Sequence, residues 1–265
     1  MAQGHRAPKK GTARMADNAE QSLPTDAALR YPFDHLRIGL ILRDMYFTKQ
    51  DPGPGDQVPD FDLPTLEGGR FRSDDLSDTG PVLMVFGSST CPVTDSSAKG
   101  LNELHGRYGD RVRFVMVNVR EAHPGANVTQ PKEFDEKREH AVLLRELHDL
   151  RFEVAVDDIG GTLHRALGPK PNSAYLLAKD GTIRFRAHWA NDTKALREAL
   201  EAITEGRPLR RTVSRGLIRP MWPTVRYVAP VLDRAGRGGW RDLWRVAPPM
   251  AAAGFLMRLL RLTPR

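Results

Sequence analysis

The chain has 265 residues, of which 40% are hydrophobic and 28% are charged, a composition that fits a globular core of about 150 residues with extensions. Its single cysteine excludes an internal disulfide, a CxxC redox pair and a cysteine-rich zinc site, and it favours a reducing compartment.

The positive charge of the chain is concentrated in one region. Residues 206–265 hold 13 arginines, no lysine and two aspartates, a net charge of +11, so that the total of +7 leaves −4 for residues 1–205. The basic net charge of the whole chain is therefore no evidence that residues 1–205 bind a polyanion. Any polyanion would bind residues 206–265. Because no recognised nucleic-acid-binding motif is present, we expect no nucleic acid partner.

The first part of the chain is polar. Residues 1–26 predict a disordered tail without the apolar segment of a secretory signal. Residues 27–54 predict a helical lead and linker, with a helix over 33–47 that packs on the body. The longest apolar stretch, 247–257, is shorter than the roughly 20 residues that span a bilayer. We expect a cytoplasmic protein, with peripheral membrane contact left open.

Residues 55–205 predict one domain. Residues 58–76 read as two short extended pieces around a Gly-Gly turn. The runs 82–86 and 112–119 are almost continuously apolar, as expected of parallel strands buried on both faces, and a helix over 92–108 joins them.

The second half of this domain continues the alternation. Residues 132–150 predict an amphipathic helix, 153–156 a strand and 160–167 a short helix. An Asp-Gly turn predicts a hairpin over 174–186, and 192–203 predict a closing helix. This order predicts an α/β thioredoxin-like fold, a central mixed β-sheet flanked by helices, with N-terminal and C-terminal extensions.

Cys91 follows the strand 82–86 through a Gly-Ser-Ser-Thr loop. Pro92 suits the first position of a helix because it lacks an N–H, which places Cys91 at the N-cap. Free N–H groups and the helix dipole favour an anion there by about 0.3–1 kcal/mol. We therefore predict a lowered thiol pKa and a reactive thiolate. The alternative is an inert cysteine that packs as a small hydrophobe.

A second polar loop follows the strand 112–119 and contains Glu121 and His123. Because the carboxyl ends of parallel strands meet at one edge of a sheet, Cys91 and His123 are expected to converge. His123 would donate a proton, and Glu121 would orient or charge it. The alternative is an exposed histidine without a role.

These stretches resemble the iodothyronine deiodinases and their bacterial relatives, which are thioredoxin-fold proteins with a selenocysteine or cysteine centre. Phe-Gly-Ser-Ser-Thr-Cys-Pro at 86–92 is similar to the family's F-G-S-x-T-U-P centre, and Glu-Ala-His-Pro at 121–124 to its E-E-A-H-P loop. The resemblance spans about residues 55 to 205. Val-Pro-Asp-Phe-Asp-Leu at 58–63 resembles the wider alkyl-hydroperoxide-reductase and thiol-antioxidant superfamily.

The resemblance implies roles for five residues. Cys91 would be the attacking thiolate, and Glu121 and His123 the acid pair that protonates the substrate or leaving group. Ser88 and Thr90 would support the centre by hydrogen bonds. The resemblance implies no metal and no organic cofactor.

Three positions depart from the family pattern. Ser173 replaces the arginine that holds the charged end of the hormone, Ser89 replaces an additional cysteine, and Arg120 replaces the first of two glutamates. Without a second thiol, an oxidised Cys91 needs an external reductant such as thioredoxin or glutathione.

The tail, residues 206–265, is rich in arginine, proline and tryptophan. Its prolines exclude one long helix, but residues 250–262 predict a short amphipathic helix with arginines opposite Phe255, Leu256, Leu259 and Leu260. The tail would bind an anionic membrane surface or pack back over the acidic body.

The leading hypothesis is a thiol-dependent oxidoreductase of deiodinase-like type that reduces a small oxidised or halogenated substrate. One alternative is a one-cysteine peroxiredoxin-like peroxidase. Another is a non-catalytic thioredoxin-like binding module whose basic tail binds a membrane or a partner. A homodimer is left open.

Overall fold

A computed structural model describes residues 31–215 and 218–264 of the chain. The predicted disordered tail, residues 1–26, lies outside the described residues.

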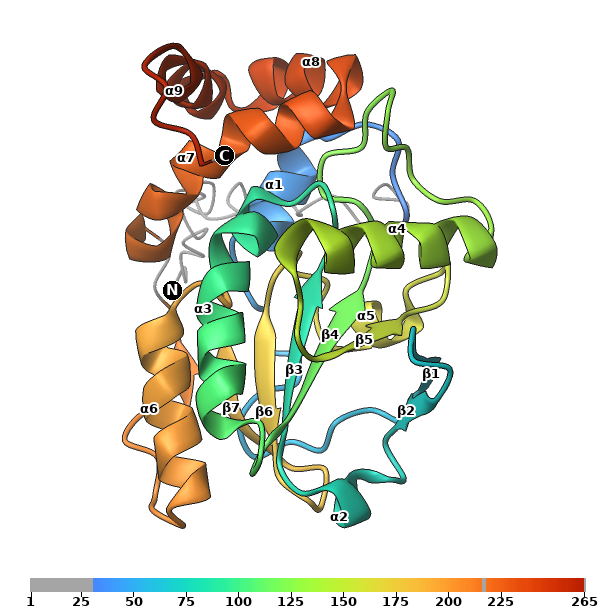
Figure 1. Ribbon diagram of the computed structural model, residues 1–265, viewed down its shortest axis with the longest axis vertical. Helices are drawn as coiled ribbons and strands as arrows, with labels where there is room; N and C mark the ends of the chain where they lie inside the picture. Colours follow the sequence, from blue (N-terminus) through green and yellow to red (C-terminus); the bar gives the residue numbers. More distant parts are fainter. Residues whose placement is uncertain (1–30, 216–217, 265) are drawn as a thin grey trace, which may run out of the picture.

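A mixed β-sheet of six strands forms the centre of the described part (Figure 1). The strands β3, β4 and β5 run parallel, whereas β6 is antiparallel to β3 and β7 is antiparallel to β6. The predicted thioredoxin-like fold with a central mixed sheet is confirmed. In sheet order the strands are β5 (Glu153–Val156), β4 (Arg113–Asn118), β3 (Val82–Gly87), β6 (Ala174–Leu177), β7 (Ile183–Ala187) and β8 (Val213–Ser214).

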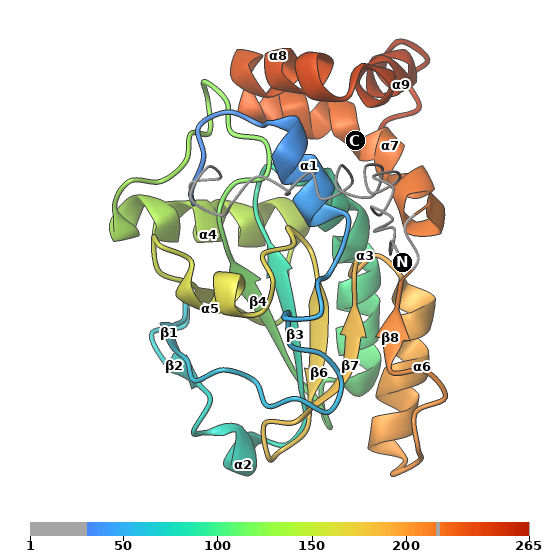
Figure 2. The same ribbon diagram turned by 180° about the vertical axis from the view of Figure 1, so that it is seen from behind.

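Different elements cover the two faces of the sheet (Figures 1 and 2). Every residue of β3 is buried, because each face of the sheet carries its own apolar cluster. One face packs against α3 (Pro92–Tyr108), α4 (Phe134–His148) and α6 (Thr193–Thr204). The other is covered by the hairpin of β1 (Asp62–Pro64) and β2 (Arg70–Arg72), by α2 (Leu76–Thr79) and by α5 (Thr162–Ala166).

Four helices from both ends of the described chain form a unit that we call the helical cap. Of the predicted helix over 33–47, the structure has α1 over Ile38–Asp44. Residues of this segment share an apolar cluster with the C-terminal helices. The Asp242 carboxylate holds the two parts together, since it accepts the Leu36 N–H at 3.1 Å. The C-terminal helices are α7 (Ile218–Ala235), α8 (Arg237–Val246) and α9 (Pro248–Leu259).

The tail is more helical than its sequence predicts. Of this region only the helix near 250–262 was expected, whereas α7 contains Pro223 and Pro230 within its length. Each proline removes one N–H donor from the helix, but α7 packs against α3, α8 and α9, and this packing offsets the loss. Among the residues that the structure describes, no helix has the length and hydropathy needed to cross a bilayer.

Candidate active site

Cys91 lies where β3 passes into α3, at the edge of the sheet covered by the cap (Figure 1). It is the N-cap residue of α3 with an extended backbone (φ −108°, ψ 113°), and Pro92 is the first helical residue. The local geometry is that expected from the sequence.

The loops that follow β3 and β4 are joined by hydrogen bonds. The Thr90 N–H and hydroxyl both donate to Glu121 Oε2, at 2.8 and 2.6 Å. The Ala122 N–H donates to Ser88 Oγ at 3.3 Å, and the His123 N–H donates to Thr90 Oγ1 at 3.2 Å. The five residues singled out for the site, Cys91 included, therefore belong to two loops in direct contact.

Glu121 is fully buried and is fixed from several sides. Gln130 holds its backbone, accepting its N–H at 3.0 Å and donating to its carbonyl at 2.7 Å. Its Oε1 lies 3.2 Å from Nδ1 of His140 on α4. Burial alone would lower the pKa of His140, but the hydrogen bond and charge of Glu121 raise it overall. The carboxylate of Glu121 thus links Thr90 to His140, and the predicted pairing of Glu121 with His123 was wrong.

His123 is partly buried between its loop and the cap, and its Nδ1 is fully covered. Burial lowers its pKa to about 4, with the charge of Asp242 on α8 acting in the opposite direction. The imidazole is therefore neutral at neutral pH. The predictions of an exposed histidine and of one charged by a neighbouring glutamate were both wrong, because the cap takes the ring out of water.

Cys91 differs most from its prediction. Its exposed fraction is 1%, and burial raises the pKa of its thiol to about 11. The predicted effect of the helix start is present, since contacts with Thr94 and with the N–H groups of Val93 and Thr94 act to lower the pKa, but burial outweighs them. The prediction of a lowered pKa was therefore wrong for this closed arrangement.

Residues from several parts of the chain cover Cys91. Cys91 shares a small apolar cluster with Trp189 and Ala122, against which Met45 after α1 and Met221 of α7 pack. The cap is fastened beside it by Arg234 of α7.

Arg234 forms a bidentate ion pair with Asp95 of the first turn of α3, at 2.9 and 3.2 Å, and also donates to the Ser89 carbonyl. The tail thus packs back on the body, one of the two arrangements expected from the sequence.

Three buried polar atoms in the two loops and in the apolar cluster of Cys91 have no hydrogen-bond partner among the residues that the structure describes. They are Ser89 Oγ, His123 Nδ1 and Trp189 Nε1. Buried polar groups are almost always paired, because each unpaired one costs about 1–3 kcal/mol. Ser89 and His123 belong to the two loops in contact and Trp189 to the apolar cluster of Cys91, so these atoms are available to a polar ligand that enters the site.

Arg120 and Ser173, two of the departures from the deiodinase pattern, are both buried. The Arg120 guanidinium stacks between the rings of Tyr31 and Phe33 and lies 3.4 Å from the Asp44 carboxylate. Arg120 therefore binds the segment that leads into α1.

Comparison with known proteins identifies the family. Residues 54–186 match the AhpC/TSA family. The chain belongs to the AhpC/TSA family. It is 27% identical over 171 residues to the thiol-disulfide oxidoreductase ResA of Bacillus thuringiensis subsp. konkukian (strain 97-27), and 26% identical over 171 residues to ResA of Bacillus cereus (strain ATCC 10987 / NRS 248). Both matches cover 63% of this chain and 88% of the relative.

The chain is also similar to a solved structure. An uncharacterized conserved protein from Geobacillus kaustophilus is 21% identical, with a TM-score of 0.49, and the match covers 63% of this chain and 89% of that one. In this AhpC/TSA chain the family match ends at residue 186, before the helices α7 to α9.

Sequence reasoning missed several residues of the site in this member of the AhpC/TSA family. His140 lies on the helix that the sequence predicts over 132–150, which follows the Glu121 loop. Its position on that helix was a signal in the sequence that pointed to the site. Gln130, Trp189 and Arg234 carried no signal, because their roles depend on contacts between distant segments.

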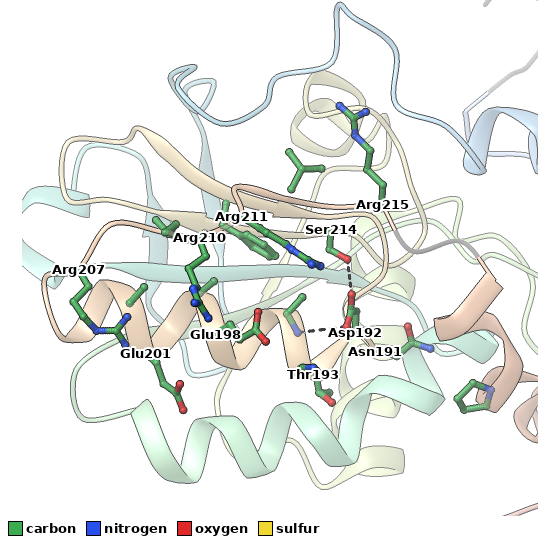
Figure 3. Close-up of a pocket in the computed structure, with 18 residues that line it drawn as sticks. Asn191, Asp192, Thr193, Glu198, Glu201, Arg207, Arg210, Arg211, Ser214 and Arg215 are labelled. Carbon is green, nitrogen blue, oxygen red and sulfur yellow. Dashed lines mark hydrogen bonds between the residues drawn. The ribbon is translucent and has the colours of Figure 1, made fainter.

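A groove of about 1050 Å³ lies elsewhere, between α6 and the segment that leads to α7 (Figure 3). The exposed side chains of Arg207, Arg210 and Arg211 lie along it above Glu198 and Glu201 of α6. None of the predicted site residues lines this groove. In residues 31–215 and 218–264, no group of three His, Cys, Asp or Glu side chains is placed to hold a metal.

Proposed function

We propose that the chain is a thiol oxidoreductase in which Cys91 is the reacting thiol and an external thiol restores it. The observation that carries the proposal is the hydrogen-bonded junction of the two loops at Thr90 and Glu121, directly beside a cysteine that begins a helix. Membership of the AhpC/TSA family and the similarity to proteins named thiol-disulfide oxidoreductase support it.

The contacts offer a route for the proton. His140, whose pKa is raised, touches Glu121, and Glu121 accepts the hydroxyl of Thr90, the neighbour of Cys91. This chain of groups leads from α4 to Thr90, the residue before Cys91. His123 is neutral, so in this proposal it contacts the substrate as a polar group and does not serve as the charged acid.

The finer proposal is a deiodinase-like reaction, and it rests on the resemblance at residues 86–92 and 121–124. The Cys91 thiolate would take iodine from an aryl iodide to form a sulfenyl iodide, while a proton replaces iodine on the ring carbon. One external thiol would release iodide and form a mixed disulfide. A second external thiol would regenerate Cys91 and leave as the oxidised disulfide. A reducing compartment such as the cytoplasm supplies these thiols.

Membership of the AhpC/TSA family favours a second reaction, peroxide reduction. Here the thiolate would attack a peroxide oxygen, the O–O bond would break to give an alcohol and a sulfenic acid, and two external thiols would return Cys91 to its reduced form with release of water.

The burial of Cys91 favours a third candidate from another class, a non-catalytic binding module. A neutral thiol covered by Trp189 and Met221 neither attacks a substrate nor meets a reductant while the cap is closed. The enzymatic proposal therefore requires α7 to move away from Cys91 during turnover.

Turnover assays separate the three candidates. Wild-type protein with a dithiol is offered an aryl iodide or an alkyl hydroperoxide, and release of iodide or loss of peroxide is followed. We expect Cys91→Ser to abolish turnover, and Glu121→Gln to lower kcat by about 100-fold, the typical contribution of proton transfer.

An opening variant serves as the control for access. Arg234→Met removes the ion pair with Asp95, and we expect it to raise both turnover and the rate of Cys91 alkylation. If Arg234→Met protein is alkylated quickly but turns over neither substrate above the level of Cys91→Ser, the enzymatic proposal is overturned and the binding module remains.

A further inference from the structure

The helix α9 is packed with its small residues inward. Ala251 and Gly254 are buried against α7, and a Cβ on Gly254 would come within 2.6 Å of Val228 Cγ1. Its large apolar residues face the other way. We call these exposed residues the α9 face: Phe255, Leu256, Leu259, Leu260 and the following Leu262.

This arrangement is the reverse of an ordinary surface helix, which buries its large apolar residues. Leu259, for example, has an exposed fraction of 64%. Contiguous apolar patches of this kind are rare on proteins that stay free in solution, and they mark interaction surfaces. The α9 face is therefore built to contact something outside the described chain.

An arginine borders the α9 face, and an exposed tryptophan lies one helical turn before it on α7. The Arg226 guanidinium on α7 donates to the Leu262 carbonyl at 3.0 Å, which ties the end of α9 to α7. Trp222, one helical turn before Arg226, has an exposed fraction of 77%. Amphipathic aromatic rings and arginines with apolar stems are the residues that favour the boundary between lipid and water.

The charge around the α9 face has one sign. Residues 218–264 contain eight arginines and two aspartates. Both aspartates are already paired within the cap, Asp233 with Arg258 and Asp242 with Arg241. The remaining charge is positive, so the surface complements anionic lipid headgroups. A symmetric contact between two copies through the same face would instead bring arginines together.

We propose that the α9 face docks the protein on an anionic membrane surface, with its apolar residues among the headgroups and acyl chains. The helix α9 lies on the side of α7 away from the sheet (Figure 1), whereas Cys91 lies in an apolar cluster against which Met221 of α7 packs. The contact is peripheral and leaves the thioredoxin-like body in water.

Vesicle sedimentation with the full chain tests this proposal. Vesicles of phosphatidylcholine alone are compared with vesicles that also contain phosphatidylglycerol. We expect binding to the anionic vesicles to be about tenfold stronger or more, and to weaken as salt is added. The double variant Leu256→Glu, Leu259→Glu should lose about 100-fold in binding, because two anchoring side chains become charged.

The matched control is Leu147→Glu, which makes the same change at an exposed leucine on α4. It should bind vesicles as wild type does. Urea unfolding confirms that all variants fold, as expected for substitutions at exposed positions. Equal binding by the double variant and wild type would overturn the proposal, as would absence of binding to anionic vesicles. A wild-type dimer that the double variant dissociates, without vesicle binding, would assign the α9 face to a second copy and also overturn it.

Discussion

The thioredoxin-like body and the helical cap are stabilised in different ways. In the body, two large apolar clusters cover the two faces of a sheet whose central strand is wholly buried. In the cap, one small cluster joins α1 to α7, α8 and α9. The contacts between the cap and the body include the small cluster around Cys91, the ion pairs of Arg234 with Asp95 and of Arg120 with Asp44, and the close approach of Gly125 to Ala235.

This difference bears on the site, because the site lies at the boundary between the two regions. The body positions Cys91, Thr90 and Glu121, whereas the cap decides whether Cys91 meets solvent. Local opening is easiest where few apolar contacts are buried. We therefore expect the cap to open while the body stays folded.

The largest effect is expected when a buried leucine is shortened in the body and, for comparison, in the cap. Leu101 of α3 belongs to the main core and Leu243 of α8 to the cap cluster, and both are buried. Leu101→Ala should lower the free energy of unfolding by about 3–5 kcal/mol in a urea titration. Leu243→Ala should change the body transition by less than about 1 kcal/mol and speed alkylation of Cys91 by about tenfold or more, because it loosens only the cap.

Equal effects of the two substitutions on one common transition, with no gain in alkylation for Leu243→Ala, would mean that body and cap unfold as one cooperative unit.

A pH titration sharpens the comparison at His123, whose Nδ1 is covered where its loop meets the cap. The pKa of His123 is lowered to about 4 from an ordinary 6.5, so the unfolded chain binds a proton before the folded one as pH falls. The stability that depends on a neutral His123 is thus complete above pH 6.5 and is lost between pH 6.5 and 4, by about 3 kcal/mol at most. His123→Gln should make this part of the profile flatter.

Urea unfolding of wild type and His123→Gln at pH 7 and pH 5 measures the difference. Parallel profiles for the two proteins would show that the cap does not keep His123 out of water.

The smallest effects are expected when each of two glycines is replaced by alanine. A Cβ on Gly125 would lie 2.1 Å from the Ala235 carbonyl oxygen of α7, whereas a Cβ on Gly106 in α3 meets nothing within 4 Å. Gly106→Ala should stabilise the protein by about 0.5–1 kcal/mol, as alanine does in a helix interior. Gly125→Ala should force the loop and the cap apart and raise the alkylation rate of Cys91. The same small stabilisation for both variants, with no change in alkylation, would contradict a tight contact between loop and cap.

The body could be predicted from the sequence because its signals are local. The apolar run 82–86, the Pro92 helix start and the Asp-Gly turn near residue 180 each specify structure within a few residues. Their order then leaves little choice of topology, and the loops that carry Cys91 and Glu121 follow from it.

The state of the thiol could not be predicted in this way. The burial of Cys91 depends on Met221 and Trp189, which lie far along the chain, and on a helix whose prolines argue against it by local rules. His140 was visible on a predicted helix, but only tertiary packing brings its ring to Glu121. The sequence therefore located the reacting groups but not the environment that sets their pKa values.

The bond between the Leu36 N–H and the Asp242 carboxylate joins residues 206 positions apart. During synthesis on the ribosome, the segment around α1 must wait for α8 before the cap can assemble, although the body already has all its strands up to β7. A nascent chain therefore lacks the cover of Met221 over Cys91 until α7 has been synthesised.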